Sequence, residues 1–281
     1  MGPSARPPAG AAARVTRRRF LQLGALTALG AAAGSGRYVA ASNALEVTHT
    51  DIELPGVGPP FTIALLSDLH APQPLFDWDA VVTASNAARP DLVLIVGDAI
   101  NRRGDEHLVE AYAPLWARHG KHAVVGNWEN WGRVRRHTLA GHYARADSAW
   151  LDNDLTELPQ LALRIVGLDE STNGWPDRSL VADAPDTSLT VVMHHSPGAF
   201  DHLPLPAESP LLMVSGHTHG GQLAPFGRAL VVPPGSGRYL RGLYGRGRHR
   251  LYVSRGLGNS HIPLRIGSRP ELAILRVRRS G

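Results

Sequence analysis

Five short apolar runs, each closely followed by residues that can bind a metal ion, constrain this chain more than any other feature. The runs cover 61–66, 92–96, 123–125, 189–193 and 211–214. The residues that follow them are carboxylates, an amide and imidazoles: Asp68, His70, Asp98, Asn127, His195, His217 and His219. Apolar runs of this length are typical of strands buried on both faces of a sheet. We therefore predict a layered α/β fold.

Loops beyond the carboxyl ends of strands lie close together in layered α/β folds, and ligands bind there. The seven side chains are therefore expected to converge on one site. Seven ligands are too many for one tetrahedral zinc ion with an open position, but they suit two ions about 3.5–4 Å apart that share a carboxylate. Mn, Fe or Zn fits imidazole and carboxylate together. The chain has no cysteine that could add a thiolate.

The remaining patterns complete a single predicted domain over 42–281. Helices are expected over 77–88, 105–118 and 134–146. An edge strand is expected over 45–52, where polarity alternates, and further strands near Trp150 and over 163–166, 251–254 and 272–277. The Pro-Pro-Gly sequence at 233–235 is a turn, too short to separate two cores.

Residues 1–41 have the composition of an export signal, with six arginines and no acidic residue. Thr16–Gln22 matches the twin-arginine consensus Ser/Thr-Arg-Arg-x-Phe-Leu-Lys except at its last position. The apolar stretch 20–33 is shorter than the roughly 20 residues of a membrane span, and small-residue cleavage sites lie at 31–33 and 39–41. We expect export by the twin-arginine machinery to an extracytoplasmic location: periplasm, cell wall or outer membrane face. An uncleaved leader that anchors the chain to a membrane is the alternative.

The ligand candidates belong to motifs that follow one another in a characteristic order. The motifs are Asp68-x-His70, Gly97-Asp98, Gly126-Asn127-x-Glu129, His195-x-Pro197 and Gly216-His217-Thr218-His219-Gly220-Gly221-Gln222. In this order, over nearly all of 45–278, the chain resembles the calcineurin-like metallophosphoesterase family. It is similar to the twin-arginine-exported bacterial branch of that family at 237–240, 242–244, 251–258 and 269–271.

The resemblance implies a four-layer α/β/β/α sandwich with mixed sheets, and a site that hydrolyses phosphoesters with two divalent ions. It implies one ion on Asp68, His70 and His219 and a second on Asn127, His195 and His217. Asp98 would bridge the two. Family members usually protonate the leaving group with a histidine that follows the motif asparagine, and here that position is Trp128.

Two explanations for Trp128 remain open. Another histidine, His194, His122 or His261, acts as the acid, or the leaving group is stable as an anion, as in a pyrophosphate bond. The catalytic candidates are therefore Asp98, Asn127 and His194.

The charge of the C-terminal part bears on the substrate. Residues 42–227 contain 11 basic and 23 acidic residues, whereas 228–281 contain 12 arginines and only Glu271 as an acid. Arg241 and Arg255 are candidate substrate contacts, and an anionic membrane surface is a candidate partner. A solvated basic face without a ligand is the alternative. No specific nucleic-acid partner is expected, because no basic groove interleaved with aromatic residues is identifiable.

The expected function is that of a phosphodiesterase. Its substrate would be an extracytoplasmic phosphodiester or pyrophosphate in a phospholipid, a nucleotide-sugar lipid or a wall polymer. A non-catalytic metal- or phosphate-binding protein is one alternative, because Trp128 replaces the usual acid. A phosphomonoesterase is another.

Overall fold

The computed structural model describes residues 41–56, 58–72, 76–182, 189–260 and 262–279. The predicted leader lies outside these ranges except for Ala41, and so does His261. Within the described residues, no helix has the length and apolar character needed to cross a membrane.

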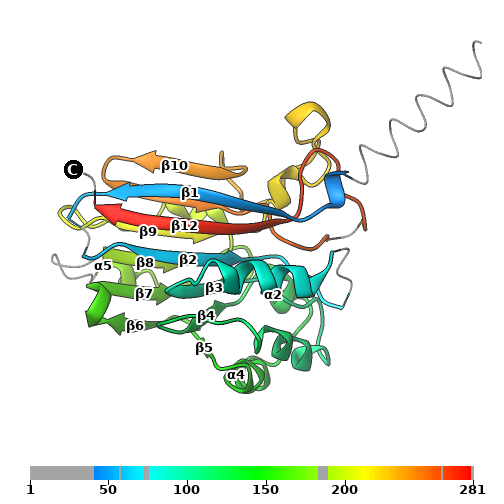
Figure 1. The fold of residues 1–281 in the computed structure, drawn as a ribbon, viewed down its shortest axis with the longest axis horizontal. Coiled ribbons are helices and arrows are strands. Elements are labelled where there is room, and N and C mark those ends of the chain that lie inside the picture. The colour runs from blue at the N-terminus through cyan, green and yellow to red at the C-terminus, as the bar shows by residue number, and fades with distance from the viewer. Residues whose placement is uncertain (1–40, 57, 73–75, 183–188, 261, 280–281) are drawn as a thin grey trace, which may run out of the picture. The chain divides into compact units, whose positions relative to one another are not determined.

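The first of two six-stranded sheets joins strands from both ends of the described chain. Its order is β1 (Glu46–Leu54), β12 (Glu271–Arg279), β2 (Phe61–Leu66), β3 (Leu92–Val96), β4 (Lys121–Val124) and β5 (Ser148–Trp150). Only β12 and β2 run antiparallel; the other neighbours are parallel. Figure 1 shows β1 in blue beside β12 in red. The predicted edge strand is confirmed, because β1 pairs on one side only and alternates between half-buried and exposed residues over most of its length.

The second sheet is also mixed. Its order is β10 (Gly242–Arg246), β11 (His249–Val253), β9 (Leu211–Ser215), β8 (Leu189–Met193), β7 (Leu163–Gly167) and β6 (Asp154–Leu158). The four inner strands are parallel, and the two edge strands pair antiparallel with their neighbours. The sequence analysis missed β6 and β10. Both are edge strands with mostly solvent-accessible residues, so neither carries an apolar run.

The main core lies between the two sheets. It combines side chains of the first sheet, such as Ile63 and Leu94, with side chains of the second, such as Ile165 and Val191. Parallel strands with both faces covered are expected to be continuously apolar, and β3, β8 and β9 are buried throughout.

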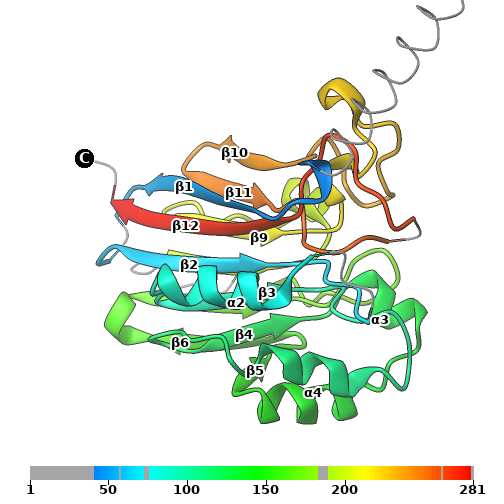
Figure 2. The same ribbon diagram turned by 45° about the vertical axis from the view of Figure 1, so that its right-hand side comes forward.

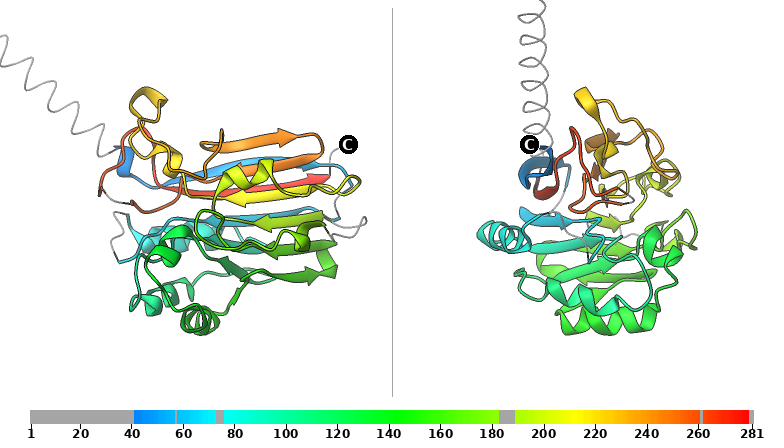
Figure 3. Two further views of the ribbon diagram at one scale, coloured as in Figure 1. Left: turned by 180° about the vertical axis from the view of Figure 1, so that it is seen from behind. Right: turned by 90° about the vertical axis from the view of Figure 1, so that its right-hand side faces the viewer.

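Helices cover the outer face of each sheet. On the first sheet these are α2 (Trp78–Ala87), the 3-10 helix Glu106–Tyr112 and α4 (Arg136–Arg145), packed through Val81, Tyr112 and Tyr143 (Figure 2). On the second sheet, the described helices in this role are α5 (Ser179–Ala182) and the 3-10 helix Pro197–Asp201 (Figure 3). The α/β fold with two mixed sheets is confirmed, with a thin fourth layer. The remaining short helices are α3 (Asn127–Trp131) and the 3-10 turns Pro159–Leu161, His219–Gly221 and Pro225–Gly227.

The α-helix predicted over 105–118 is wrong in both its length and its type. Only Glu106–Tyr112 is helical, and it is a 3-10 helix. Asp105 makes no capping hydrogen bond through its side chain. Pro114 has no N–H to donate to the carbonyl of Glu110, so a continuing α-helix would lose a hydrogen bond there.

Candidate metal centre

The structure brings the ends of five strands together. In the first sheet β2, β3 and β4 are parallel and end at one edge, and β8 and β9 do the same in the second. The loops after them carry all seven predicted ligands: Asp68 and His70 after β2, Asp98 after β3, Asn127 after β4, His195 after β8, and His217 and His219 after β9. Each of the seven residues is at most 5% exposed. Residues up to about 150 positions apart thus share one buried site.

The backbone at this site is strained. Twelve described non-glycine residues have positive φ, and five of them are predicted ligands: Asp68 (54°), His70 (53°), Asp98 (52°), His217 (72°) and His219 (51°). The left-handed region costs a non-glycine residue roughly 1–2 kcal/mol. Such strain concentrates at functional sites, where surrounding contacts maintain it. The remaining seven positive-φ residues are scattered over turns.

The first group of candidate ligands is Asp68, His70 and His219. Nε2 of His219 lies 3.4 Å from Oδ1 of Asp68 and 3.1 Å from Nε2 of His70. Nδ1 of His70 is 2.7 Å from Oδ1 of Asn101. Because that oxygen only accepts, Nδ1 of His70 donates and Nε2 carries the lone pair that faces the group.

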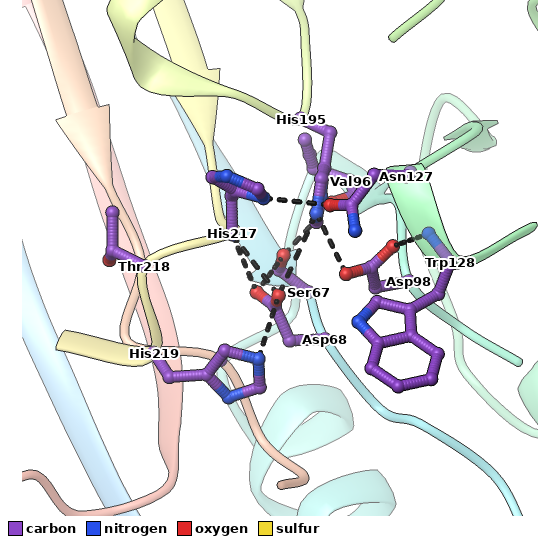
Figure 4. Close-up of polar contacts among 12 residues, drawn as sticks. Ser67, Asp68, Val96, Asp98, Asn127, Trp128, His195, His217, Thr218 and His219 are labelled. Carbon is purple, nitrogen blue, oxygen red and sulfur yellow. Dashed lines mark hydrogen bonds and ion pairs between the residues drawn. The ribbon is translucent and has the colours of Figure 1, made fainter. Parts of the chain in front are cut away.

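The second group is Asp98, His195 and His217. Oδ2 of Asp98 is 3.0 Å from Nε2 of His195, and it is also 3.8 Å from Nε2 of His70 in the first group. Asp98 therefore belongs to the second group and also faces the first, as a shared carboxylate would. Figure 4 shows Asp68 and Asp98 among the imidazoles of His195, His217 and His219, with the indole of Trp128 beside Asp98.

Lone pairs face one another in the second group. The carbonyl of Pro234 accepts from Nε2 of His217 at 2.7 Å, which leaves a lone pair on Nδ1. That Nδ1 lies 2.7 Å from Oδ1 of Asn127, another acceptor. His195 donates from Nδ1 to the carbonyl of Val96 at 2.8 Å, so its Nε2 also points a lone pair at Asp98 when the ring is neutral. Opposed acceptors of this kind fit a cation between them.

The electrostatics of the site agree with this donor set. Burial by itself lowers the pKa of His195, but the nearby carboxylates of Asp98 and Asp68 outweigh it and raise the pKa to about 10. The same proximity to His195 keeps the pKa of Asp98 below its ordinary value, although burial opposes this. Two buried carboxylates thus require positive charge nearby, which a proton on His195 or divalent cations would supply. The residues fit a pair of divalent cations.

Glu129 is a buried residue that holds the backbone next to the candidate ligands. Its carboxylate accepts four backbone N–H groups, those of Gly126 (2.9 Å), Asp98 (3.1 Å), Ala99 (2.6 Å) and Ile100 (3.1 Å). These bonds tie the start of α3 to the loop after β3. Burial, and then the charge of Asp98, raise the pKa of Glu129 to about 7.

Arg265 is a second buried support. It is fully buried and donates to the carbonyls of Gly258 and Arg255, and its Nη2 lies 3.2 Å from Nδ1 of His219. Donation to Nδ1 leaves the proton of neutral His219 on Nε2, so a cation that binds Nε2 has to displace that proton.

The sequence analysis assigned no role to Glu129, Arg265, Ser67 or Asn101. Ser67 donates to Asp68 at 2.5 Å, and its Oγ also lies 2.9 Å from the carbonyl oxygen of Val96. Only Glu129 had a detectable signal, because a glutamate three residues after the residue that caps a helix commonly accepts from the capping backbone. The other contacts depend on residues distant in sequence.

An open pocket of about 390 Å³ leads to the ligand groups. Its floor includes Asp98, Asn127, His217 and His219. Its walls are mostly apolar: Trp128, Trp131, Thr218, Gly221, Gln222, Leu223, Val231, Pro233, Pro234, Ser260 and Ile262.

None of the described acid candidates reaches this pocket. His194 is fully buried, donates from Nδ1 to the carbonyl of Ser196, and has a pKa lowered by burial to about 4. His122 lies within β4, away from the pocket lining, and burial lowers its pKa to about 4 as well. His261 lies outside the described residues. Trp128 lines the pocket, and its backbone N–H donates to Oδ1 of Asp98 at 2.8 Å.

The two candidate substrate arginines are also absent from the pocket lining. Arg255 pairs with Glu46 at 2.8 Å and with Glu271 at 3.3 Å. Arg241 donates to the carbonyls of Gly267 and Gly227 at 3.2 and 3.4 Å. Arg255 is therefore engaged by residues of β1 and β12, and Arg241 contacts the loop that contains Gly227.

Comparison with known proteins identifies the class to which this fold and site belong. Residues 61–221, more than half of the chain, match the calcineurin-like phosphoesterase family, and the chain belongs to that family. Members of this family use divalent metal ions, in agreement with the two ligand groups.

Individual relatives align over nearly their full length. The uncharacterized metallophosphoesterase YkuE of Bacillus subtilis is 29% identical, with 94% of this chain and 98% of YkuE covered. The phosphodiesterase YaeI of Escherichia coli is 28% identical, with 94% and 99% covered. Among solved structures, the NAD nucleotidase NadN of Haemophilus influenzae matches with a TM-score of 0.46 and 14% identity, over 71% of this chain and 45% of NadN.

Proposed function

We propose that this protein hydrolyses phosphodiester or pyrophosphate bonds with the help of two divalent cations. The observation that carries the proposal is the pair of buried ligand groups connected through Asp98, at an open pocket. Its similarity over nearly the full length to the phosphodiesterase YaeI supports the same reaction class.

Two bound divalent cations would offset the charge of a phosphoryl group and acidify a water molecule near neutral pH. The chain's own residues prepare the site for this. The backbone N–H of Trp128 holds Oδ1 of Asp98, which turns Oδ2 toward His195 and His70. Val96 and Pro234 fix the ring orientations of His195 and His217 through their carbonyls.

The pocket favours substrates that need no proton donor. Its only titratable lining residues among those described are Asp98, His217 and His219, and all three are candidate ligands. No described lining side chain is left to protonate a leaving oxygen, so leaving groups stable as anions are favoured. The apolar walls at Trp131, Val231 and Pro233 suit the second organic group of a diester, which a monoester lacks.

We also propose that the protein acts outside the cytoplasm. The twin-arginine motif in Thr16–Gln22 and the apolar stretch after it support export in the folded state. The substrate would then be an extracytoplasmic phosphodiester or pyrophosphate in a phospholipid, a nucleotide-sugar lipid or a wall polymer.

Metal analysis joined to an activity screen tests the reaction. The full-length chain is stripped with chelator, reloaded with Mn²⁺ and assayed with bis-p-nitrophenyl phosphate and with p-nitrophenyl phosphate. We expect two ions per chain and faster turnover of the diester. Faster turnover of the monoester would instead identify a phosphomonoesterase.

A non-catalytic metal- or phosphate-binding protein is the second candidate, and Trp128 in the pocket wall is the observation that favours it. Bound metal with no turnover of either compound at any metal loading would establish that alternative.

A further inference from the structure

One wall of the pocket continues into an unusually apolar surface loop, residues 223–234, which we call the rim loop. Phe226 is 99% exposed, Val231 75%, Leu230 66% and Val232 43%. Two more exposed apolar residues, Trp131 and Ile262, also line the pocket. Large exposed apolar groups that gather beside a binding site mark an interaction surface, whereas isolated ones need no explanation. The loop projects from the sheets in the views of Figures 2 and 3.

The rim loop is held in place at its base. Ala224 donates to the carbonyl of Ile266 at 2.7 Å, and Leu230 donates to the carbonyl of Leu223 at 3.0 Å, which closes the loop on itself. At its tip Phe226 has φ of 54° and ψ of 28°, a left-handed conformation that is unfavourable for a non-glycine residue. Folding gains nothing from a strained and exposed phenylalanine. The tip is therefore built to contact something else.

Two arginines without an acidic partner in the described chain, Arg228 and Arg241, lie in the rim loop or against it. Residues 209–270 contain nine arginines and no acidic residue or lysine. Arg228 is exposed within the loop, and Arg241 donates to the carbonyl of Gly227, next to Phe226. Neither arginine forms an ion pair with a carboxylate of the described chain. Apolar side chains flanked by arginines are the combination that binds the interface of an anionic bilayer. The apolar side chains enter the headgroup–acyl boundary, and the arginines contact lipid phosphates.

We propose that the rim loop docks this protein onto an anionic lipid bilayer, with Phe226 and Leu230 in the headgroup–acyl boundary and Arg228 against lipid phosphates. Leu223, Val231, Pro233 and Pro234 belong both to the loop and to the pocket wall, so docking brings the pocket mouth to the lipid surface. The phosphoester that reaches the ligand groups is then part of a lipid, with its apolar chains along the rim. The docking proposal does not depend on the proposed function. The inference that the substrate is a lipid rests on the proposed function.

Sedimentation with vesicles tests the docking. Full-length protein and the variants Phe226→Asn and Leu230→Gln are mixed with phosphatidylcholine vesicles, with and without phosphatidylglycerol. Asn tolerates a left-handed backbone, so Phe226→Asn should fold normally. We expect binding of the wild type to the anionic vesicles and a loss of at least about tenfold in each variant. Trp175→Gln, which removes another exposed aromatic residue outside the pocket lining, is the matched control and should bind like the wild type.

Charge is tested separately with Arg228→Gln against Arg103→Gln, an exposed arginine elsewhere. Only Arg228→Gln should weaken binding to anionic vesicles, and added salt should reduce the difference. Turnover of soluble bis-p-nitrophenyl phosphate should be the same in all these proteins. If that turnover is absent while vesicle binding follows the predicted pattern, the proposed function fails and docking stands.

Equal vesicle binding by wild type and Phe226→Asn would overturn the docking proposal. So would loss of soluble-substrate turnover in Phe226→Asn, because the loop would then serve the pocket itself. A wild-type dimer that Phe226→Asn converts to monomers would also overturn it, in favour of a second copy of the chain as the occupant.

Discussion

At the scale of single residues, the candidate centre is defined by which atoms face each other. Oδ2 of Asp98 faces a histidine of its own group and one of the other group, 3.0 Å from His195 and 3.8 Å from His70. Its other oxygen is already committed to the backbone of Trp128. Oδ1 of Asp68 makes the other cross-contact, 3.4 Å from His219 and 3.8 Å from His195. Because Oδ2 of Asp98 faces histidines of both groups, its removal should disable both.

Asp98→Ala should lose both retained metal ions and lower the turnover of bis-p-nitrophenyl phosphate by more than about 100-fold. This loss of activity should exceed the 10- to 100-fold loss that is typical when a residue hydrogen-bonded to a metal ligand is replaced. Metal content and rate are measured after gel filtration, with the exposed Asp154→Ala as control. Normal turnover in Asp98→Ala would refute the bridging role.

Trp128→His should leave metal content unchanged and accelerate substrates with poor leaving groups most. A histidine at this position could protonate the leaving oxygen, a contribution of about 10²–10⁴-fold that matters least when the leaving group is a stable anion. Rates for a series of aryl diesters of rising leaving-group pKa measure this. An equal acceleration across the series would show that Trp128 does not occupy the position of a missing general acid.

At the scale of elements, α3 and the loop after β3 act as one unit through Glu129. α3 has only five residues, so it gains little stability of its own, and the glutamate's four backbone bonds hold it against the strained backbone of Asp98. The position of Asp98 and Asn127 relative to each other therefore depends on a side chain outside the ligand set.

Glu129→Gln should weaken metal binding by about 10- to 100-fold, because the amide NH₂ would face backbone N–H donors that the carboxylate now satisfies. Competition with a chelator of known affinity provides the measurement. Glu157→Gln on β6, an exposed position, should change nothing. Unaltered metal affinity in Glu129→Gln would mean that the loop geometry persists without these bonds.

At the scale of the whole molecule, the two sheets share one apolar core, and a histidine is buried in the first of them. His122 shares a strand face with Val124, which belongs to the core between the sheets, and neither ring nitrogen has a hydrogen-bond partner in the described structure. Burial lowers the pKa of His122 from 6.5 to about 4. The ring is accordingly neutral in the folded protein near pH 7.

Acid should therefore destabilise the metal-free protein between about pH 6.5 and 4, because the unfolded chain takes up a proton at His122 that the folded chain refuses. This group contributes stability above pH 6.5 that falls by up to about 3 kcal/mol as the pH approaches 4. Denaturant unfolding across this range measures it. His122→Leu should flatten the decline, whereas the exposed His137→Leu should not; parallel curves for wild type and His122→Leu would contradict the burial argument.

The sequence by itself determined the fold class, most strands and the identity of the seven residues that gather at the strand ends. An apolar run predicts a buried strand from local sequence alone. The residues that directly follow a parallel strand lie at the carboxyl edge of its sheet, so their convergence can be predicted as well. Only the tertiary structure decided what depends on register between distant segments: the pairing of Asp98 with His195, the support from Glu129 and Arg265, and the engagement of Arg255 by Glu46 and Glu271. It also decided the exposure of the rim loop, because apolar residues such as Leu230 and Val231 look like core residues in a sequence until their neighbours are known.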